Sequence, residues 1–407
     1  MTRVIHTGDT HIGYQQYHSP ERREDFLAAF RQVVDDAVED GVDAVVHAGD
    51  LFHDRRPELV DVLGTVSALR ELSGAGIPFL AVVGNHETKR DAQWLDLFES
   101  LGLATRLGSE PTVVGDTAFY GLDYVPRSQR EALTYEFEPS DADHAALVAH
   151  GLFQPFPHGD WDAGAILEAS DVAFDAVLLG DDHTPRTAEL DGAWLTYPGS
   201  TERASAAERE DRGYNIVSFD GEARVSRRGL PTREFVFVDV ELAPGEGAER
   251  VTERVGQHDL ENAVVVVTVT GEGEQFPPAQ VEGFVADRGA LVVRVNDRRE
   301  FEEESELSAS FADPDDAVRE RLREMGLSDA ARGVDEVVRA SKTPDSRVTE
   351  TVERRVRELL DDEAAFTAGD DGPADAASGD GEAVDTASAE DPTAESPEAD
   401  QPRLGDF

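Results

Sequence analysis

Five short apolar stretches of this sequence each run directly into a polar cluster of similar composition. They cover residues 3–6, 44–47, 79–83, 145–149 and 176–179, and the polar side chains that follow are Asp9 and His11, Asp50 and His53, Asn85 and His86, His150, and Asp181 and His183. Short apolar runs bounded by turn residues are typical of buried strands. Because the carboxyl ends of parallel strands meet at one rim of a sheet, we predict that the clusters converge on one site.

Helical patterns lie between the early strands. Residues 22–39 and 59–72 carry apolar side chains at three- and four-residue spacing, and further strands are predicted at 112–114 and 194–196. This alternation of strands and helices favours a layered α/β fold, which we assign to residues 1–228.

A second pattern of strands and helices occupies residues 229–300. The predicted strands are 235–242, 263–269 and 291–295, and the predicted helices are 251–256 and 278–287. We expect a smaller α+β domain here.

The apolar period becomes helical in the segment that we assign to residues 301–366. One stripe carries Val348, Val352, Val356, Leu359 and Leu360. This stripe either packs on its own domain or binds a groove of a partner, and its place beyond two complete domains favours the partner. Residues 367–400 contain no Lys or Arg and a lone Val384, so we predict a disordered acidic linker.

The chain is strongly acidic. It has 37 Lys and Arg against 86 Asp and Glu, a formal net charge of −49 at pH 7, and its lysines are Lys89 and Lys342. Such repulsion is tolerable where the Debye length is roughly 3 Å, at about 1 M salt. Acid spread over every segment indicates a halophilic protein, with an acidic mimic of nucleic acid as the alternative. The charge therefore does not exclude DNA as a substrate.

The absence of cysteine excludes disulfides, zinc–thiolate sites, iron–sulfur clusters and a cysteine nucleophile. The sequence has no apolar run of about 18 residues and no signal sequence, so we expect a cytoplasmic protein without a membrane partner.

The donors at the strand ends suit Mn²⁺, Fe²⁺ or Zn²⁺, and their oxygen content favours a near-octahedral ion. Their number suffices for two cations about 3.5–4 Å apart that share one carboxylate.

The order of these clusters (D-x-H, G-D, G-N-H-E, H and G-x-x-H) resembles that of the calcineurin-like metallophosphoesterase superfamily. The stretches 11–14, 49–57 and 197–203 are similar to the SbcD-type nucleases of DNA double-strand-break repair, called meiotic recombination eleven in archaea and eukaryotes. The similarity covers residues 1–228 and continues more loosely beyond them. It implies a β-sandwich flanked by helices, a DNA-capping domain at 229–300, a homodimer, and an SMC-like ABC ATPase (SbcC or radiation-sensitivity type) bound by the stripe.

The resemblance also implies roles for the site residues. One ion is held by Asp9, His11, Asp50 and His183, and the other by Asp50, Asn85, His150 and Asp181, so that Asp50 bridges them. His86 matches the histidine that stabilises the phosphate or protonates the leaving oxygen, and His53 matches one that orients the scissile phosphate. The expected cofactor is two Mn²⁺ per subunit, with Mg²⁺, Fe²⁺ or Zn²⁺ as alternatives.

Two positions depart from the pattern of the family. Asp181 stands where histidine is usual, which makes the site more negative, and Glu87 stands where aspartate is commoner. We expect a manganese-dependent nuclease that acts on DNA ends, a 3′→5′ double-strand exonuclease with single-strand endonuclease activity. The alternatives are a small-molecule phosphodiesterase and a DNA-end-binding scaffold whose nuclease Asp181 has weakened.

Some charged residues flank the clusters. Arg55, Arg56, Lys89 and Arg90 either contact DNA phosphates or are ordinary loop charges. Six other histidines have no motif around them and are interpreted as core or surface residues: His6, His18, His47, His144, His158 and His258.

The last seven residues differ from the acidic linker. Gln401, Leu404 and Phe407 resemble the short motif by which repair proteins bind the PCNA sliding clamp. The usual motif ends in two aromatic residues and this one in a single aromatic, so the alternative is the end of a solvated tail.

Overall fold

The structure, a computed structural model, describes residues 1–299. Three predicted features lie outside the described residues: the helical segment 301–366 with its apolar stripe, the acidic linker 367–400, and the motif of Gln401, Leu404 and Phe407. Among the described residues, no helix has both the length and the apolar character needed to cross a membrane.

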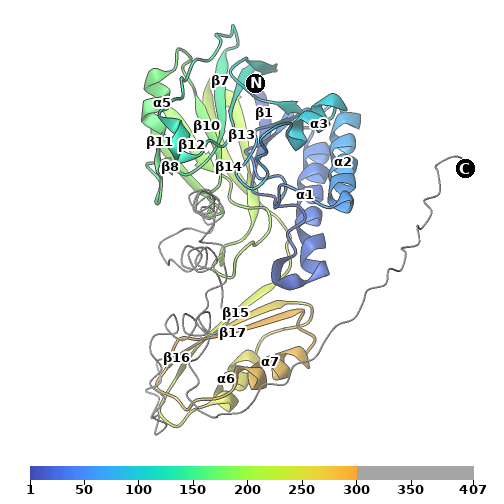
Figure 1. Cartoon of the computed structure of the whole chain (residues 1–407), viewed down its shortest axis with the longest axis vertical. Helices are drawn as coiled ribbons and strands as arrows, with labels where there is room; N and C mark the ends of the chain where they lie inside the picture. The colour runs from blue at the N-terminus through green and yellow to red at the C-terminus, as the bar shows by residue number, and fades with distance from the viewer. Residues whose placement is uncertain (300–407) are drawn as a thin grey trace, which may run out of the picture. The chain divides into compact units, whose positions relative to one another are not determined.

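Two six-stranded sheets form the larger part of the described chain (Figure 1). The first has the order β14-β13-β1-β2-β3-β4, in which β1 to β4 are parallel and β13 is antiparallel to both of its neighbours. Its strands are β1 (Thr2–Thr7), β2 (Ala44–His47), β3 (Phe79–Ala81), β4 (Thr105–Arg106), β13 (Gly213–Asp220) and β14 (Glu222–Gly229).

The second sheet has the order β11-β12-β10-β7-β6-β5. Its four inner strands are parallel, and β11 and β5 pair antiparallel at the two edges. Its strands are β5 (Thr112–Val114), β6 (Thr117–Leu122), β7 (His144–His150), β10 (Ala176–Gly180), β11 (Arg186–Leu190) and β12 (Ala193–Tyr197).

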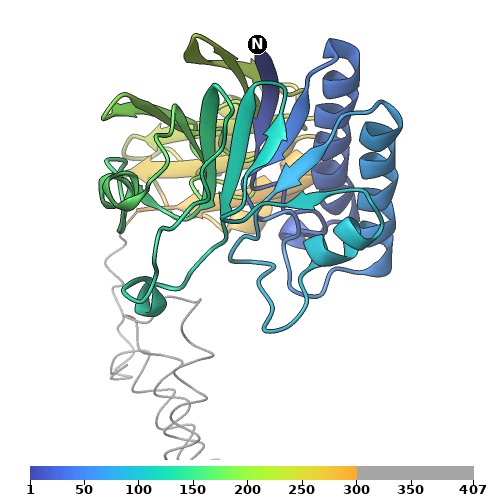
Figure 2. The same cartoon turned by 90° about the horizontal axis from the view of Figure 1, so that it is seen from above.

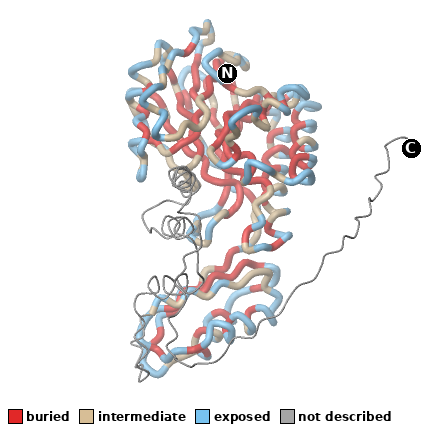
Figure 3. Tube along the Cα trace, in the orientation of Figure 1, coloured by how far each residue is buried: buried red, intermediate tan, exposed pale blue. Residues whose placement is uncertain are grey.

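The sheets pack face to face and helices cover their outer faces. Val4 and Val46 of the first sheet share one core with Val148 and Leu178 of the second. The helices α1 (Pro20–Asp40), α2 (Leu59–Gly74) and α3 (Trp94–Ser100) pack on the first sheet, and α5 (Ala163–Ala169) packs on the second. Figure 2 shows α1 and α2 side by side on the outer face of the first sheet, and Figure 3 shows the buried strands at the centre. The predicted layered β-sandwich is confirmed.

Local signals set the ends of these elements. The helix predicted at 22–39 begins earlier, at Pro20, because the Ser19 hydroxyl accepts the Arg22 N–H at 3.2 Å. It ends before Gly41, which adopts a left-handed conformation with φ 59°. The strand predicted at 79–83 ends at Ala81, since the Val83 N–H bonds the Asp123 carboxylate at 2.7 Å.

A smaller parallel sheet follows, with strands β15 (Phe235–Leu242), β16 (Val264–Gly271) and β17 (Val292–Asp297). The helices α6 (Ala248–Val255) and α7 (Pro278–Ala286) pack on it through the core that contains Val251, Val267 and Val281. These elements agree within a few residues with those predicted for 229–300. The remaining short elements are η1 (Gln16–His18), α4 (Arg127–Arg130), β8 (Phe153–Gln154) and β9 (Trp161–Asp162).

Candidate metal centre

The structure brings the five polar clusters together at the carboxyl ends of strands from both sheets. Asp9 and His11 follow β1, Asp50 follows β2, and Asn85 and His86 follow β3. His150 is the last residue of β7, and Asp181 and His183 follow β10. The predicted convergence is therefore present, and it spans the sandwich rather than a single sheet.

One group of candidate ligands consists of Asp9, His11 and His183, whose ligand atoms lie within 4.8 Å of one another. Nε2 of His11 lies 3.0 Å from Nε2 of His183. Imidazole nitrogens bind a metal ion at about 2.0–2.1 Å, so two of them at right angles on one ion stand about 3 Å apart. The pair is arranged as two ligands of the same cation would be.

A second group consists of Asp9, Asp50 and His150. Nε2 of His150 lies 3.0 Å from Oδ1 of Asn85, 3.5 Å from Oδ2 of Asp50 and 3.7 Å from Oδ1 of Asp181. The same Asp50 oxygen lies 3.9 Å from Nε2 of His11. Asp9 belongs to both groups, and one oxygen of Asp50 faces a histidine of each, so either carboxylate lies within reach of both.

Asp181 contacts Asp9, although the sequence analysis assigned the two residues to different ions. Its backbone N–H contacts both carboxylate oxygens of Asp9 at 3.1 Å, while its side chain is directed at His150. The residue that departs from the family pattern therefore presents an oxygen to the second group.

The loops that carry these side chains adopt strained backbone conformations. Asp9, His11, Asp50 and Asp181 all have positive φ, at 49°, 42°, 56° and 100°. Such angles cost of order 1–3 kcal/mol each in residues other than glycine, and they cluster at functional sites. A Cβ on Gly84 would stand 2.1 Å from Oδ1 of Asp50, so glycine is required there for the two loops to approach.

Burial dominates the electrostatics of the carboxylates. It raises the pKa of Asp50 to about 8 and also raises the pKa of Asp9. Burial lowers the pKa of His150, but Asp50, Asp181 and Asp9 outweigh it and raise that pKa to about 9. A buried cluster in which carboxylates and a histidine share protons has the donor chemistry to take up divalent cations in their place. The residues present therefore fit a divalent metal centre.

Two further histidines lie beside this centre. The rings of His53 and His86 are 5.4 and 4.9 Å from that of His11, measured between centroids. Nδ1 of His86 lies 2.9 Å from the carbonyl oxygen of His53, and Tyr14 stacks on His53 at 3.9 Å. Burial lowers the pKa of His53 to about 4. His53 and His86 thus lie beside the candidate ligand His11.

Two carboxylates support the site through contacts that the sequence analysis did not predict. Glu87 is buried, and its side chain accepts the N–H groups of Leu51, Phe52 and Gly84 at 3.2–3.3 Å, which ties two loops together. Glu208 contacts Nδ1 of His183 at 2.8 Å. The position of Glu87 inside the third cluster was a signal for its role, whereas Glu208 lies in a charged loop 25 residues from His183 and had none.

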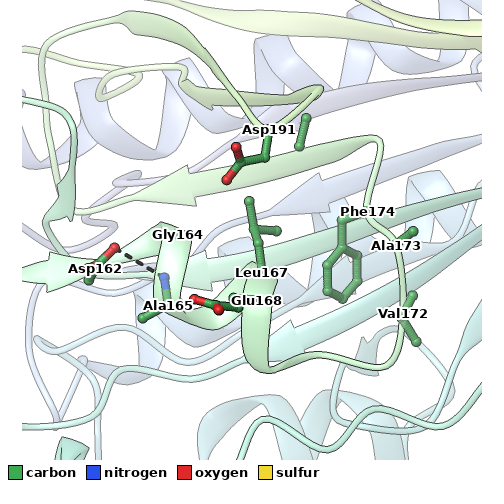
Figure 4. A pocket seen from close by; sticks show the side chains of 10 residues that line it. Asp162, Gly164, Ala165, Leu167, Glu168, Val172, Ala173, Phe174 and Asp191 are labelled. Carbon is green, nitrogen blue, oxygen red and sulfur yellow. Dashed lines mark hydrogen bonds between the residues drawn. The ribbon is translucent and has the colours of Figure 1, made fainter.

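The structure also gathers the basic residues that flank the clusters. Arg55, Arg56, Lys89 and Arg90 line one hollow of about 970 Å³ together with Tyr124 and Gln129. A second hollow of about 570 Å³ lies beside α5, and it contains none of the predicted site residues (Figure 4). Of the histidines without a motif, His6 and His47 are fully buried, as the core interpretation requires.

The amino-acid sequence is similar to one protein family model and to several known proteins. Residues 2–185 match the family model described as calcineurin-like phosphoesterase. The chain is 63% identical over 389 residues to the DNA double-strand break repair protein Mre11 of Haloferax volcanii, covering 95% of this chain and 88% of that protein. It is 59% identical to the protein of the same name from Halobacterium salinarum, covering 91% and 98%. For that of Methanosarcina mazei the identity is 44%, covering 88% and 60%.

Proposed function

This chain belongs to the Mre11 family of DNA double-strand break repair proteins, and we propose that it is a manganese-dependent nuclease acting on DNA ends in the cytoplasm. It is a metal-dependent phosphodiester hydrolase with a divalent metal centre. The observation that carries the proposal is the position of Asp50, whose Oδ2 lies 3.9 Å from Nε2 of His11 and 3.5 Å from Nε2 of His150.

We assign Asp9, His11, Asp50 and His183 to one Mn²⁺ and Asp50, Asn85, His150 and Asp181 to another. When bound, two such cations lower the pKa of a water molecule and hold the non-bridging oxygens of a phosphodiester. The buried carboxylates of Asp9 and Asp50 would hold the ions in place. Since the set of Asp50, Asn85, His150 and Asp181 contains three oxygen donors and one nitrogen, it favours the harder Mn²⁺ or Mg²⁺ over Zn²⁺.

His86 and His53 act on the substrate. Because a carbonyl oxygen only accepts hydrogen bonds, Nδ1 of His86 carries the proton in its contact with His53. This contact fixes the His86 ring. When the ring also carries a proton on Nε2, that nitrogen can donate to a phosphate oxygen or to the leaving 3′ oxygen. His53 is held by the stacked Tyr14 ring and orients the scissile phosphate.

The basic hollow provides contacts with the DNA backbone. Arg55, Arg56, Lys89 and Arg90 are concentrated around it in a chain of net charge −49. We expect Arg90→Ala to weaken DNA binding for every sequence and to reduce the dependence of binding on salt by about one phosphate contact.

The exposed apolar face of α2 and α3 is the surface through which we propose that two copies associate. Leu59, Val60 and Leu63 of α2 are 73%, 59% and 58% exposed, and Leu97 of α3 and the adjoining Leu101 are 39% and 49% exposed. Figures 1 and 2 both show α3 beside α2. Exposed apolar residues on two neighbouring helices are typical of an interaction surface, and in this proposal a second copy of the chain covers them in a homodimer.

The partner ATPase of SMC-like ABC type binds, in this proposal, to the stripe of Val348, Val352, Val356, Leu359 and Leu360. A charge placed within this contact is buried without a partner and costs several kcal/mol. Val352→Glu should therefore release the ATPase in co-purification and leave cleavage of a small diester unchanged. Retention of the ATPase by this variant would mean that the stripe packs on its own domain.

The C-terminal motif docks on a sliding clamp in this proposal, with Leu404 and Phe407 as apolar anchors and Gln401 setting the orientation. The linker raises the effective concentration of the nuclease at the clamp. Calorimetry of a peptide of residues 397–407 against the clamp in molar KCl should give heat that Phe407→Ala abolishes. Equal heats for both peptides would reduce the motif to a solvated tail.

The nuclease proposal is tested with end-labelled duplex DNA in molar KCl, with Mn²⁺, Mg²⁺ and Zn²⁺ in separate reactions and a chromogenic phosphodiester beside the DNA. We expect Mn²⁺-dependent shortening of the duplex that exceeds turnover of the small diester. Efficient turnover of the small diester with intact DNA would favour a small-molecule phosphodiesterase. DNA binding without cleavage under any of the three ions would favour the scaffold whose nuclease Asp181 has weakened.

A further inference from the structure

Glu208 makes a contact with the candidate metal centre that no sequence pattern indicates. Oε1 of Glu208 lies 2.8 Å from Nδ1 of His183. A carboxylate oxygen only accepts a hydrogen bond, so Nδ1 of His183 carries the proton. The other ring nitrogen, Nε2, then presents its lone pair on the side where it lies 3.0 Å from Nε2 of His11. Glu208 therefore selects the atom that His183 offers to a metal ion.

The second oxygen of Glu208 is anchored by its own loop. Oε2 accepts the backbone N–H of Ala204 at 3.0 Å and the Ser200 hydroxyl at 3.4 Å, and it lies 3.3 Å from Nη1 of Arg212. The carboxylate is thus held on both oxygens, and it has little freedom to turn away from His183.

Arg212 also contacts His183, through the backbone of that histidine. Its side chain is 1% exposed, and its Nη1 donates to the backbone carbonyl of His183 at 2.9 Å. Its Nε and Nη2 donate to the carbonyl of Glu210 at 3.0 and 2.8 Å. Arg212 therefore fixes the backbone of His183, while Glu208 fixes the ring.

The other candidate histidine ligands lack such a partner. Nδ1 of His150 lies 2.7 Å from the backbone carbonyl of Ala48, and Nδ1 of His11 is buried without a hydrogen-bond partner. Among these three, only His183 has a carboxylate as the partner of its Nδ1. A carboxylate on the outer nitrogen makes an imidazole a stronger ligand than a neutral carbonyl does.

We propose that Glu208 is a positioning residue that orients His183 and strengthens its bond to the first metal ion. This inference rests on the proposed function, since it assumes that His183 is a ligand. The loss of a hydrogen-bonding partner of a metal-binding histidine typically weakens metal affinity by about 10- to 100-fold. We expect a loss in that range for Glu208→Ala and a smaller one for Glu208→Gln, which retains an acceptor oxygen but not the charge.

The test is calorimetric titration of Mn²⁺ into the metal-free full-length chain in molar KCl. Glu210→Gln is the matched control, because Glu210 is an exposed carboxylate of the same loop and the substitution removes the same charge. Thermal unfolding of the metal-free variants measures any general loss of stability. Glu208→Gln provides the test if Glu208→Ala fails to fold.

A double-mutant cycle with His183→Ala separates positioning from a structural effect. If Glu208 acts through His183, the Glu208 substitution weakens Mn²⁺ binding in the wild-type background and has no further effect when His183 is already absent. Equal losses in both backgrounds, or affinities of both Glu208 variants equal to that of Glu210→Gln, would overturn the inference and leave the nuclease proposal standing. A wild-type chain that binds no Mn²⁺ would overturn both.

Discussion

The contact between His86 and the carbonyl of His53 has a consequence for the rate of cleavage. His86 donates through Nδ1 at 2.9 Å, and its assigned role is in proton donation rather than in metal binding. General acid–base groups contribute about 10²- to 10⁴-fold to rate. We therefore expect His86→Gln to bind Mn²⁺ with wild-type stoichiometry and to cleave DNA at least about a hundredfold more slowly.

The measurement combines initial cleavage rates with calorimetric Mn²⁺ binding on the same preparation. A His86→Gln protein that loses an equivalent of bound Mn²⁺ would show that His86 is a ligand. Wild-type cleavage by the variant would remove His86 from the reaction.

His6 on β1 makes stability depend on pH. It is fully buried, and burial lowers its pKa to about 3. The neutral form is therefore favoured in the folded state, and its contribution to stability is complete above pH 6.5, the ordinary value. That contribution falls by about 1.4 kcal/mol for each unit of pH as the pH drops from 6.5 towards 3.

We predict that His6→Leu removes this component of acid sensitivity. The free energy of unfolding of the metal-free chain, measured by denaturant titration at pH 7.5 and pH 5, should fall less on acidification in the variant than in the wild type. The carboxylates make the same contribution to the pH dependence of both proteins, so it cancels in the comparison. Equal falls would mean that His6 is not held neutral.

At the residue scale, the sequence predicted the side chains that share strand-end positions. Asp9, Asn85 and His150 were predictable because an apolar run ends one to three residues before each of them. Glu208 and Arg212 were not, since they reach His183 through the fold of a loop with no periodic pattern. Hydrogen-bond partners distant in the sequence have no local signature of this kind.

Among the secondary-structure elements of the described residues, α2 has the most exposed large apolar side chains. We predict that Leu63→Glu, at a position 58% exposed, leaves the fold intact and dissociates the proposed homodimer, because the charge would be buried unpaired between copies. Light scattering with size exclusion in molar KCl should give a monomer mass. Val113→Glu is the matched control, since Val113 of β5 is 54% exposed on the other sheet. Dimers of Leu63→Glu as stable as those of Val113→Glu would exclude this face.

The bounds of strands were predicted well where one or both faces of the strand are buried, because burial imposes a regular apolar pattern. The strand at 44–47 and the strand at 235–242 have their observed bounds, because their residues are almost all apolar or alternate regularly. β14 (Glu222–Gly229) was missed, since it is an edge strand in which Ala223 and Val225 stand among arginines. An edge strand buries few side chains, and its pairing with β13 supplies the stability that its own pattern does not indicate.

For the whole molecule, the net charge of −49 predicts that salt stabilises the fold. Raising KCl from 0.1 to 1 M shortens the Debye length from about 10 to about 3 Å, which weakens repulsion among the carboxylates. We expect the thermal midpoint of the metal-free chain to rise across this range, as suits a protein similar to those of Haloferax volcanii and Halobacterium salinarum. A midpoint that is constant or falls would show that repulsion does not limit stability.

The whole account depends on Asp50, the buried carboxylate that lies 3.5 Å from His150 and 3.9 Å from His11. The most direct measurement is the initial rate of Mn²⁺-dependent cleavage of end-labelled duplex DNA by Asp50→Asn in molar KCl, with thermal unfolding to confirm that the variant is folded. Removal of a group that stabilises developing charge costs about 10²- to 10³-fold, so the rate should fall at least a hundredfold. Cleavage by folded Asp50→Asn at the wild-type rate would contradict the two-ion centre.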